Sequence, residues 1–307
     1  MPAWVFCVWG AAMNKKRKKV LDDIKNFLIF CGPTTFVFLT VIIVPFLFGI
    51  YLTFTNWDGI SKTYTSAGME NYMMVFKDEV FWKSFLLTLR YVFYTVVFTN
   101  LIAFFLARAL TSGIRAQNLL RAGYFTPNLV GGIILGLIWN FVFSNILTFI
   151  GNSYGIEVLK SSWLGKPDTA FWALVLVTVW QYSGYMMVIY IAGFMNLPKD
   201  VLEAAEIDGV NARNKLTKIV LPLMVPSFII CIFLTLQRCF MVYDVNLSLT
   251  KGGPFKSTQL ISMHVYEKAF LAQQYGVGQA EAFFLFLIVA IIAVTQLYFS
   301  KKLEVEA

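Results

Sequence analysis

Residues 196–227 read NLPKDVLEAAEIDGVNARNKLTKIVLPLMVPS and form a long polar interruption between two strongly apolar runs. Pro198 suits the first turn of a helix, because a proline there removes no intrahelical hydrogen bond. A helical pattern then continues to Gly209, and a second pattern begins at Ala212 and runs into the next apolar segment. The stretch therefore predicts a short helix, a glycine turn and a second helix that enters an apolar medium.

The composition outside this stretch indicates an all-α integral membrane protein. The chain is 58% hydrophobic and only 14% charged, which a soluble core of this size does not need. A helix of about 20 residues crosses the hydrocarbon layer. Apolar runs of that order predict six transmembrane helices at residues 27–53, 85–109, 119–143, 171–194, 219–242 and 282–299. Gly131, Gly132 and Gly136 in the third run predict a face where another helix approaches closely.

Lysine and arginine fix the expected orientation, because positively charged loops stay in the cytoplasm. Fifteen such residues flank one side of the predicted spans and eight lie on the other. We therefore expect a basic cytoplasmic tail at residues 1–26, a transmembrane domain at 27–300 with a cytoplasmic loop at 196–218, and a cytoplasmic tail at 301–307. This asymmetry, facing anionic lipid, explains the net charge of +8 without nucleic-acid binding.

Residues 1–12 are apolar but lack a preceding basic segment, and a basic cluster follows them. They do not match a cleaved signal peptide. Because Met13 is followed directly by NKKRKK, we expect the first twelve residues to be an extension from an upstream start.

No catalytic or metal-binding pattern stands out. His264 has no neighbouring carboxylate or cysteine in the sequence, which predicts a surface or interfacial place for it. A phosphate loop is missing because Phe255 stands where glycine would precede Lys256. The four cysteines lack metal-ligand spacing and are expected to be packing residues: Cys7, Cys31, Cys231 and Cys239. The chain is therefore not expected to be an enzyme or to bind a metal or cofactor itself.

The polar loop carries a specific pattern, EAA, then DG, then I-x-LP, and this resembles the permease subunits of type I ATP-binding-cassette importers. The matching residues are Glu203, Ala204, Ala205, Asp208 and Gly209. The resemblance implies that the loop forms a coupling helix, which sits in a groove of a separate ATPase subunit. Ala204 and Ala205 would allow close approach, Glu203 would be an anionic anchor and Gly209 would allow the sharp bend.

A second pattern, LT-x-GGP, resembles sugar-importer permeases of the maltose and multiple-sugar type. It comprises Leu249, Thr250, Gly252, Gly253 and Pro254, and the Y-x2-AF element of the same permeases follows at Tyr266, Ala269 and Phe270. The resemblance implies an extracytoplasmic turn near the mouth of the path, meeting the binding protein or the sugar. A turn that only shapes the loop is the alternative.

The sugar path is expected in the fourth and fifth spans, where polar and aromatic side chains can bind hydroxyls and ring faces. Matching the fourth span to these permeases points to Thr178, Gln181, Tyr182 and Tyr185, and the fifth span adds Thr235, Gln237, Arg238 and Cys239. The tyrosines could instead be packing residues. Arg238 could instead pair with Asp244 or with a second permease. Without a phosphate-sized basic cluster, a neutral di- or oligosaccharide is the preferred cargo.

The sequence thus favours a sugar-importer permease in a bacterial-type plasma membrane, with both termini cytoplasmic. The resemblance implies a different, homologous second permease, although a homodimer stays open. It also implies two ATPase subunits carrying ATP and Mg²⁺, and an extracytoplasmic sugar-binding protein. An ion-coupled secondary sugar transporter is the alternative. Such a transporter should carry carboxylates inside its spans, whereas Asp244 and Glu281 stand only at span ends.

Overall fold

The computed structural model describes residues 25–301, which are helical apart from turns, connecting loops and one isolated β-bridge between Thr55 and Ser66. The elements in chain order are α2 (Gly32–Phe38), η1 (Leu39–Ile43), α3 (Val44–Leu52), α4 (Glu70–Lys77), α5 (Glu79–Leu110), α6 (Gln117–Leu129), α7 (Gly132–Phe141), η2 (Val142–Ile146), α8 (Leu147–Tyr154), η3 (Glu157–Leu159), η4 (Trp163–Gly165), α9 (Pro167–Met195), α10 (Lys199–Ile207), α11 (Ala212–Asn214), η5 (Lys215–Val220), α12 (Leu221–Leu223), α13 (Val225–Phe240), α14 (Asp244–Leu249), α15 (Ile261–Tyr266), η6 (Glu267–Leu271) and α16 (Tyr275–Lys301). The predictions for residues 1–24, including the extension at 1–12, and for 302–307 lie outside the described residues.

Apolar helices long enough to cross a membrane dominate the architecture. By length and composition there are five among the described residues: Gly32–Leu52, Glu79–Leu110, Gly132–Tyr154, Pro167–Met195 and Tyr275–Phe299. A sixth results if the bent pair Ala212–Leu223 and Val225–Phe240 is one span. The prediction of an all-helical, many-spanning membrane protein is therefore confirmed.

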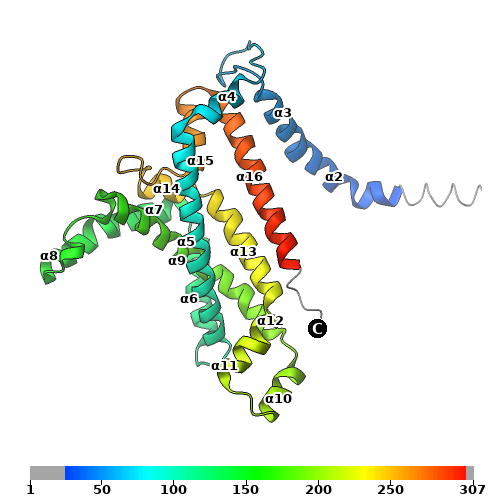
Figure 1. Ribbon diagram of the computed structural model, residues 1–307, viewed down its shortest axis with the longest axis vertical. Coiled ribbons are helices and arrows are strands. Elements are labelled where there is room, and N and C mark those ends of the chain that lie inside the picture. Colours follow the sequence, from blue (N-terminus) through cyan, green and yellow to red (C-terminus); the bar gives the residue numbers. More distant parts are fainter. Residues whose placement is uncertain (1–24, 302–307) are drawn as a thin grey trace, which may run out of the picture.

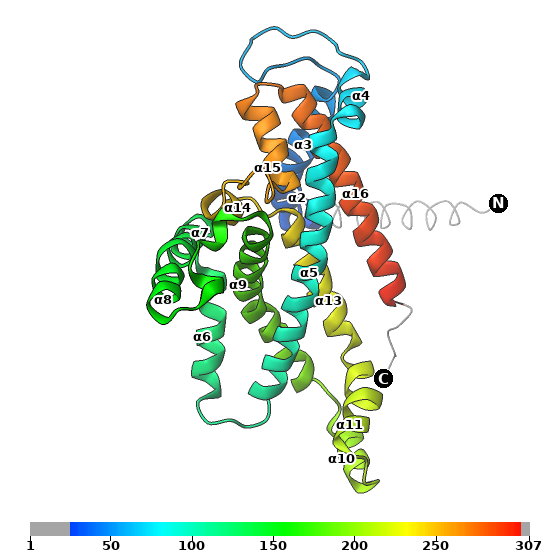
Figure 2. The same cartoon turned by 60° about the vertical axis from the view of Figure 1, so that its left-hand side comes forward.

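Helix α5 is the centre of the bundle. It packs against α9 over a long contact and also against α13 and α15. Its buried face carries Phe81, Tyr91, Ala103 and Ala107 among other residues, alternating large rings with small side chains. Helix α10 projects from one end of the bundle, and α4 lies at the other end (Figures 1 and 2). The bundle thus separates the predicted coupling loop from α4 by its full length, whereas α8 and α14 lie nearer its middle (Figure 1).

The first span contacts this bundle where α3 packs on α16, but most of its surface is exposed. Helices α2 and α3 lead away from the other helices in Figure 1, and 6% of the apolar window in Gly32–Leu52 is buried. Phe36, Val41 and Leu47 are all more than half exposed. This span therefore offers an apolar surface to lipid or to another membrane subunit.

The structure divides the residues of the third predicted span between two helices. Helix α6 ends at Leu129, Val130 and Gly131 are extended, and α7 begins at Gly132 and turns away from α6 (Figure 2). A β-carbon on Gly136 would lie 1.9 Å from Ser248 Oγ of α14. The predicted close approach is confirmed at Gly132 and Gly136, where α7 packs on α14, but not at Gly131, whose added β-carbon would meet no atom within 4 Å.

The fifth predicted span is also not straight. Its two parts meet at Met224 with a bend of 66°. Pro222 and Pro226 stand on either side, and proline removes a backbone donor and disturbs the preceding helical turn. The bend directs the chain from the projecting α10 region back into the bundle along α13.

Candidate functional site

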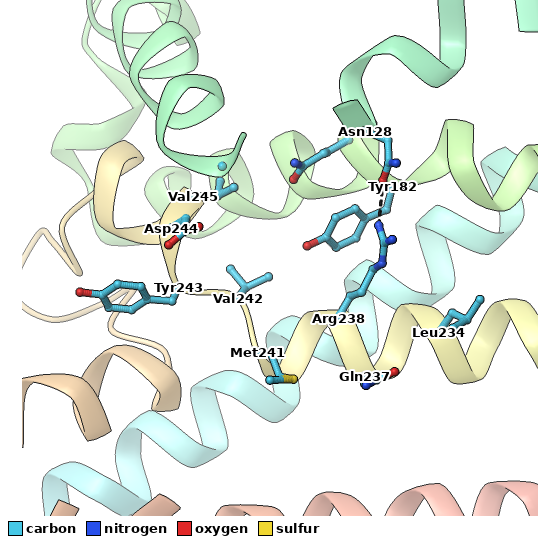
Figure 3. Close-up of a pocket in the computed structure, with 12 residues that line it drawn as sticks. Asn128, Tyr182, Leu234, Gln237, Arg238, Met241, Val242, Tyr243, Asp244 and Val245 are labelled. Atoms are coloured by element: carbon cyan, nitrogen blue, oxygen red, sulfur yellow. Dashed lines mark hydrogen bonds between the residues drawn. The ribbon is translucent and has the colours of Figure 1, made fainter. Parts of the chain in front are cut away.

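A polar cavity of about 580 Å³ lies where the end of α6 faces α9 and α13 (Figure 3). Its walls are completed by the start of α7 and by the linker from α13 to α14. The residues lining it are Asn128, Gly132, Gln181, Tyr182, Leu234, Gln237, Arg238, Met241, Val242, Tyr243, Asp244 and Val245. Both helix breaks therefore contribute to this cavity. The break between α6 and α7 leaves Asn128 and Gly132 in its wall, and the bend at Met224 directs α13 toward them.

Arg238 is held in the cavity wall by neutral partners. Its Nη1 donates a hydrogen bond to Asn128 Oδ1 at 2.7 Å, as Figure 3 shows. The guanidinium carbon lies 4.6 Å from the ring centroid of Tyr185 and 5.3 Å from that of Tyr182, both within cation–π range. The suggested ion pair with Asp244 does not form among the described residues. Asp244 lines the same cavity separately.

Gln181 offers the cavity an unused acceptor. Its side chain is 7% exposed, and Nε2 donates to the Val130 backbone oxygen at 3.3 Å. Oε1 is buried and accepts no hydrogen bond from any described residue. A buried polar atom without a partner costs stability. Because Gln181 lines the cavity, a hydroxyl donor on a bound ligand could satisfy this oxygen.

Three of the predicted path residues lie in packed interior instead of in the cavity wall: Thr178, Thr235 and Cys239. Thr178 accepts a hydrogen bond from the Tyr91 hydroxyl at 2.8 Å. Thr235 donates to the Cys231 backbone oxygen at 2.6 Å. The Thr178 bond joins α9 to α5, the Thr235 bond to Cys231 lies within α13, and Asn100 Nδ2 of α5 donates to Thr235 Oγ1 at 3.4 Å. Four other predicted residues do line the cavity: Gln181, Tyr182, Gln237 and Arg238. The ring of Tyr185 contacts the guanidinium of Arg238.

Asn128, Tyr243 and Asp244 also line the cavity, although the sequence did not single out any of them as a contact for the ligand. Asn128 had a usable signal, because it is an amide that directly follows Pro127 in an apolar run. Tyr243 and Asp244 belong to a short linker between helices, where periodicity gives no information. The position of this linker in the cavity wall depends on the bend that leads into α13.

The predicted coupling loop forms α10 and the glycine turn after it. Gly209 has a φ of 68°, and the Val210 N–H donates to the Ala205 oxygen at 3.0 Å, which closes the helix end. A β-carbon on Gly209 would meet no atom within 4 Å, so the backbone conformation and not the available space favours glycine here. The Lys215 ammonium lies 2.7 Å from Glu206 Oε1, and that hydrogen bond lowers the pKa of Glu206.

A shallow groove of about 440 Å³ runs along α10, lined by Asp200, Val201, Ala204, Ala205, Asp208, Val210 and Ile219. The Ala205 side chain is 4% exposed and therefore packs within this chain, whereas Ala204 and Asp208 are exposed. Glu203 is exposed and lies outside the groove. Ile207 is 86% exposed, which is unusual for an apolar side chain on a projecting helix.

The LT-x-GGP residues form a tightly bonded turn. The Thr258 hydroxyl donates to Thr250 Oγ1 and to the Gly253 oxygen, both at 2.8 Å. Leu249 is buried, and Gly252 has a φ of 75°, which glycine tolerates best. These contacts support the loop-shaping alternative for Leu249 and Thr250. The outer surface of the turn is instead presented by Phe255, which is 94% exposed.

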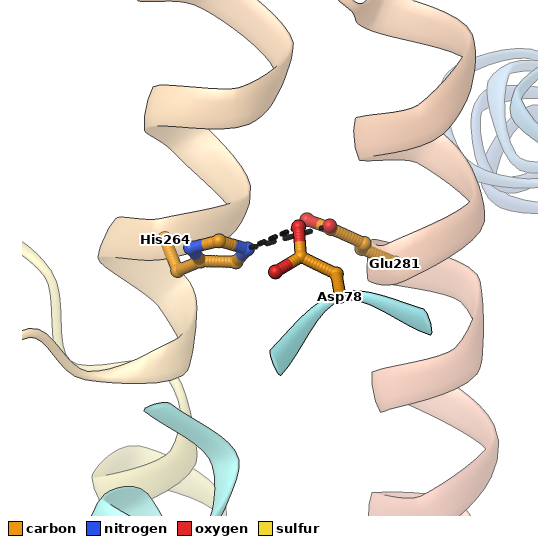
Figure 4. Close-up of side chains that lie close together, drawn as sticks. All are labelled: Asp78, His264 and Glu281. Carbon is orange, nitrogen blue, oxygen red and sulfur yellow. Dashed lines mark hydrogen bonds and ion pairs between the residues drawn. The ribbon is translucent and has the colours of Figure 1, made fainter. Parts of the chain in front are cut away.

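His264 lies inside a buried charged cluster, so the prediction of a surface or interfacial place is wrong. Its Nε2 is 3.3 Å from Glu281 Oε1 and 3.9 Å from Asp78 Oδ2 (Figure 4). Lys268 Nζ lies 2.6 Å from the same Asp78 oxygen. Burial opposes the charged form of Asp78, but the Lys268 hydrogen bond and two backbone N–H groups prevail and lower its pKa. The partners come from three distant segments, so sequence proximity could not reveal them.

Glu281 is 0% exposed although it is the seventh residue of α16, so it does not stand merely at a span end. The lack of carboxylates inside the predicted spans was an argument against ion-coupled transport, and the burial of Glu281 weakens that argument. Asp78, His264 and Glu281 are also the described residues whose ligand atoms could surround a cation, all within 4.8 Å of one another. Such a cation would compete with Lys268 for Asp78 Oδ2.

A bundle of membrane-spanning helices with a polar cavity at its helix breaks and a helix projecting from one end defines a membrane transport subunit. The chain belongs to the family described as binding-protein-dependent transport system inner membrane component, whose model matches residues 99–305. The resemblance to importer permeases of the ATP-binding-cassette type is thus confirmed.

Two relatives support this membership. The chain is 42% identical to the probable starch degradation products transport system permease protein AmyD of Thermoanaerobacterium thermosulfurigenes, over 96% of this chain and 100% of the relative. It is 32% identical to the multiple sugar-binding transport system permease protein MsmF of Streptococcus mutans, over 85% of this chain and 90% of the relative. Both relatives are permease proteins in name.

The fold also matches solved structures. A chain of a bacterial ABC transporter involved in the import of the acidic polysaccharide alginate superposes with a TM-score of 0.79. The match covers 92% of this chain and 99% of the other, at 17% sequence identity. At that identity the likeness establishes the importer-permease fold.

Proposed function

We propose that this chain is the transmembrane subunit of an ATP-driven importer for a neutral di- or oligosaccharide, and that it forms half of the translocation path. The observation that carries the proposal is the unpartnered, buried Oε1 of Gln181, a residue that lines the cavity between α9 and α13. A sugar hydroxyl is a donor of the size and type that this oxygen requires. The names of the relatives, which refer to starch degradation products and multiple sugars, support the same class.

The charge of the cavity favours a neutral cargo. Arg238 and Asp244 both line it, so their formal charges cancel. Arg238 is moreover already engaged by Asn128 and two aromatic rings. A neutral sugar could bind beside these partners through Gln181, Gln237 and the ring of Tyr182.

Energy is proposed to come from partner subunits. The coupling helix α10, with Glu203, Ala204, Ala205, Asp208 and Gly209, would enter a groove of an ATPase subunit, and ATP and Mg²⁺ would be held by two such subunits. The exposed Ile207 and the groove beside Ala204 support docking at this helix. This chain then transmits movement and performs no hydrolysis itself.

A second, homologous permease and an extracytoplasmic sugar-binding protein complete the proposed assembly. The largely exposed first span supports a further membrane subunit. The alginate importer is described in complex with a sugar-bound periplasmic protein, which supports the binding protein. We place the chain in a bacterial-type plasma membrane, with both termini and α10 in the cytoplasm and the turn at Leu249, Thr250, Gly252, Gly253 and Pro254 outside.

Uptake measurements on the assembled transporter test the cavity. Gln181→Ala should raise KM for the transported sugar about fivefold, because one buried hydrogen bond contributes about 1 kcal/mol. Gln274→Ala, which removes the same amide from an exposed loop, is the matched control. If Gln181→Ala and Arg238→Ala both leave affinity and selectivity unchanged over a panel of oligosaccharides, the cavity is not the recognition site.

A further inference from the structure

A continuous row of aromatic rings leads away from the cavity. Tyr243, which lines the cavity at the end away from Arg238 (Figure 3), has its ring centroid 4.9 Å from that of Tyr266. Phe270 follows at 5.0 Å, Tyr275 at 5.5 Å and Trp57 at 5.0 Å. The row thus joins the cavity to the loop at residues 53–69, which lies at the end of the bundle opposite α10 (Figure 1).

The packing of η6 on α16 explains why these rings are available. A β-carbon on Gly278 of α16 would lie 2.6 Å from the Ala269 β-carbon, so two small residues bring the helices into direct contact. Ala269 is buried in that contact. Tyr266 and Phe270, three residues before and one after it, remain 40% and 55% exposed. The Y-x2-AF motif therefore combines one buried packing residue, Ala269, with two exposed aromatic rings.

The row differs from the apolar surfaces of the first span. Tyr243, Tyr266 and Tyr275 carry hydroxyls and Trp57 carries an indole N–H, which already donates to the Ser61 oxygen. Aromatic side chains with polar edges suit a ligand that is apolar on its faces and polar around its rim. A pyranose ring has this character, whereas a lipid chain has no use for the polar edges.

We propose that Tyr243, Tyr266, Phe270, Tyr275 and Trp57 form a binding track for the sugar rings of an oligosaccharide that extends beyond the cavity. This inference rests on the proposed function, since it assigns the outer part of the same path. The cavity holds one end of the chain through hydrogen bonds, and the track holds the following sugar units through ring contacts. Long oligosaccharides therefore gain more from the track than disaccharides do.

The test uses the full assembly of permeases, ATPase subunits and binding protein in proteoliposomes, with maltose and maltohexaose as probes. Phe270→Leu and Tyr266→Leu keep the apolar character but remove the flat ring. They should lower uptake of maltohexaose about three- to tenfold and leave maltose uptake within about twofold. Phe270→Tyr and Tyr266→Phe, which retain the ring, should behave like the unmodified protein. Phe93→Leu, an exposed ring on α5 outside the row, is the matched control.

Three results would overturn the track. Equal loss for both sugars, or no loss for either, would show that the rings do not act on chain length. Loss of the second permease on purification of the leucine variants would show that the rings are subunit contacts. If the unmodified assembly takes up neither maltose nor maltohexaose, the proposed function itself fails and the track fails with it. That outcome differs from the others, in which the unmodified assembly does take up sugar.

Discussion

The Arg238 guanidinium on α13 and the Asn128 amide at the end of α6 are joined by a hydrogen bond of 2.7 Å across the polar cavity. Asn128 is available there because α6 ends one residue later and the chain becomes extended. The bond therefore links the two interrupted segments of the bundle. It also holds the one arginine of the cavity in place against Tyr185.

Replacement of Asn128 by Leu should leave the Arg238 charge with ring contacts alone. A hydrogen bond to a charged group contributes about 1.5–3 kcal/mol, so the melting temperature of the purified permease should fall. Uptake should fall as well, because Arg238 would no longer be fixed. Thermal unfolding and uptake, measured on the same preparation, check this. Asn128→Leu with both values unchanged would show that the bond has no role.

Ile207 and Ala205 should respond differently to substitution, although both lie on α10. Ile207→Ser removes an 86% exposed side chain and should leave folding unchanged while weakening co-purification of the ATPase subunit and abolishing coupled uptake. Ala205→Asp places a charge in the chain's own packing and should lower the melting temperature. Leu119→Ser, at another exposed apolar position, serves as the control for Ile207. Intact ATPase binding in Ile207→Ser would contradict this assignment.

The buried cluster should be sensitive to the loss of one partner and tolerant of the loss of two. His264→Leu leaves the fully buried Glu281 beside an apolar group and should cost about 3–5 kcal/mol of folding stability. The double variant His264→Leu with Glu281→Leu should recover most of that loss, because no uncompensated charge remains. Denaturation of the single and double variants forms a double-mutant cycle. A strictly additive cycle would mean that the two side chains do not interact.

Cysteine labelling should separate the two ends of the bundle. In a background with Cys7 and Cys31 replaced by Ser, Phe255→Cys should react with an impermeant reagent added outside cells. Ile207→Cys, in cells that express the permease without the ATPase subunits, should react only after the membrane is opened. Both positions are more than four-fifths exposed, so access and not burial decides the result. Reaction of Ile207→Cys from outside would reverse the proposed orientation.

Sequence patterns were strongest where a local signal determines structure. The EAA residues and the apolar spans are contiguous in sequence, and the structure has helices at each, with the DG residues in the turn that follows α10. The third and fifth spans were each predicted as a single transmembrane helix because hydropathy averages over a window and does not register a turn such as that at Val130 and Gly131. The helix break and the bend at Met224 depend on packing between distant segments.

Four of the eight predicted sugar-path residues line the cavity, and the reason that three of the others do not is geometric. Thr178, Thr235 and Cys239 are polar or small residues of the right spans, but their side chains face α5 or neighbouring helices in the packed interior. A helix packed on several sides has no single polar face that periodicity can reveal. The burial of Glu281 was not predicted for a related reason, because the burial of a residue near a span end depends on which segments pack against it.

The source of energy is the most direct test of the account, because a buried carboxylate such as Glu281 is also what an ion-coupled transporter would need. The measurement is oligosaccharide uptake into proteoliposomes that contain this permease with its proposed partners and the binding protein. Uptake should require ATP on the side of α10 and should persist when ionophores collapse the proton and sodium gradients. Uptake without ATP that follows an imposed ion gradient and is lost in Glu281→Gln would contradict the proposed ATP-driven mechanism.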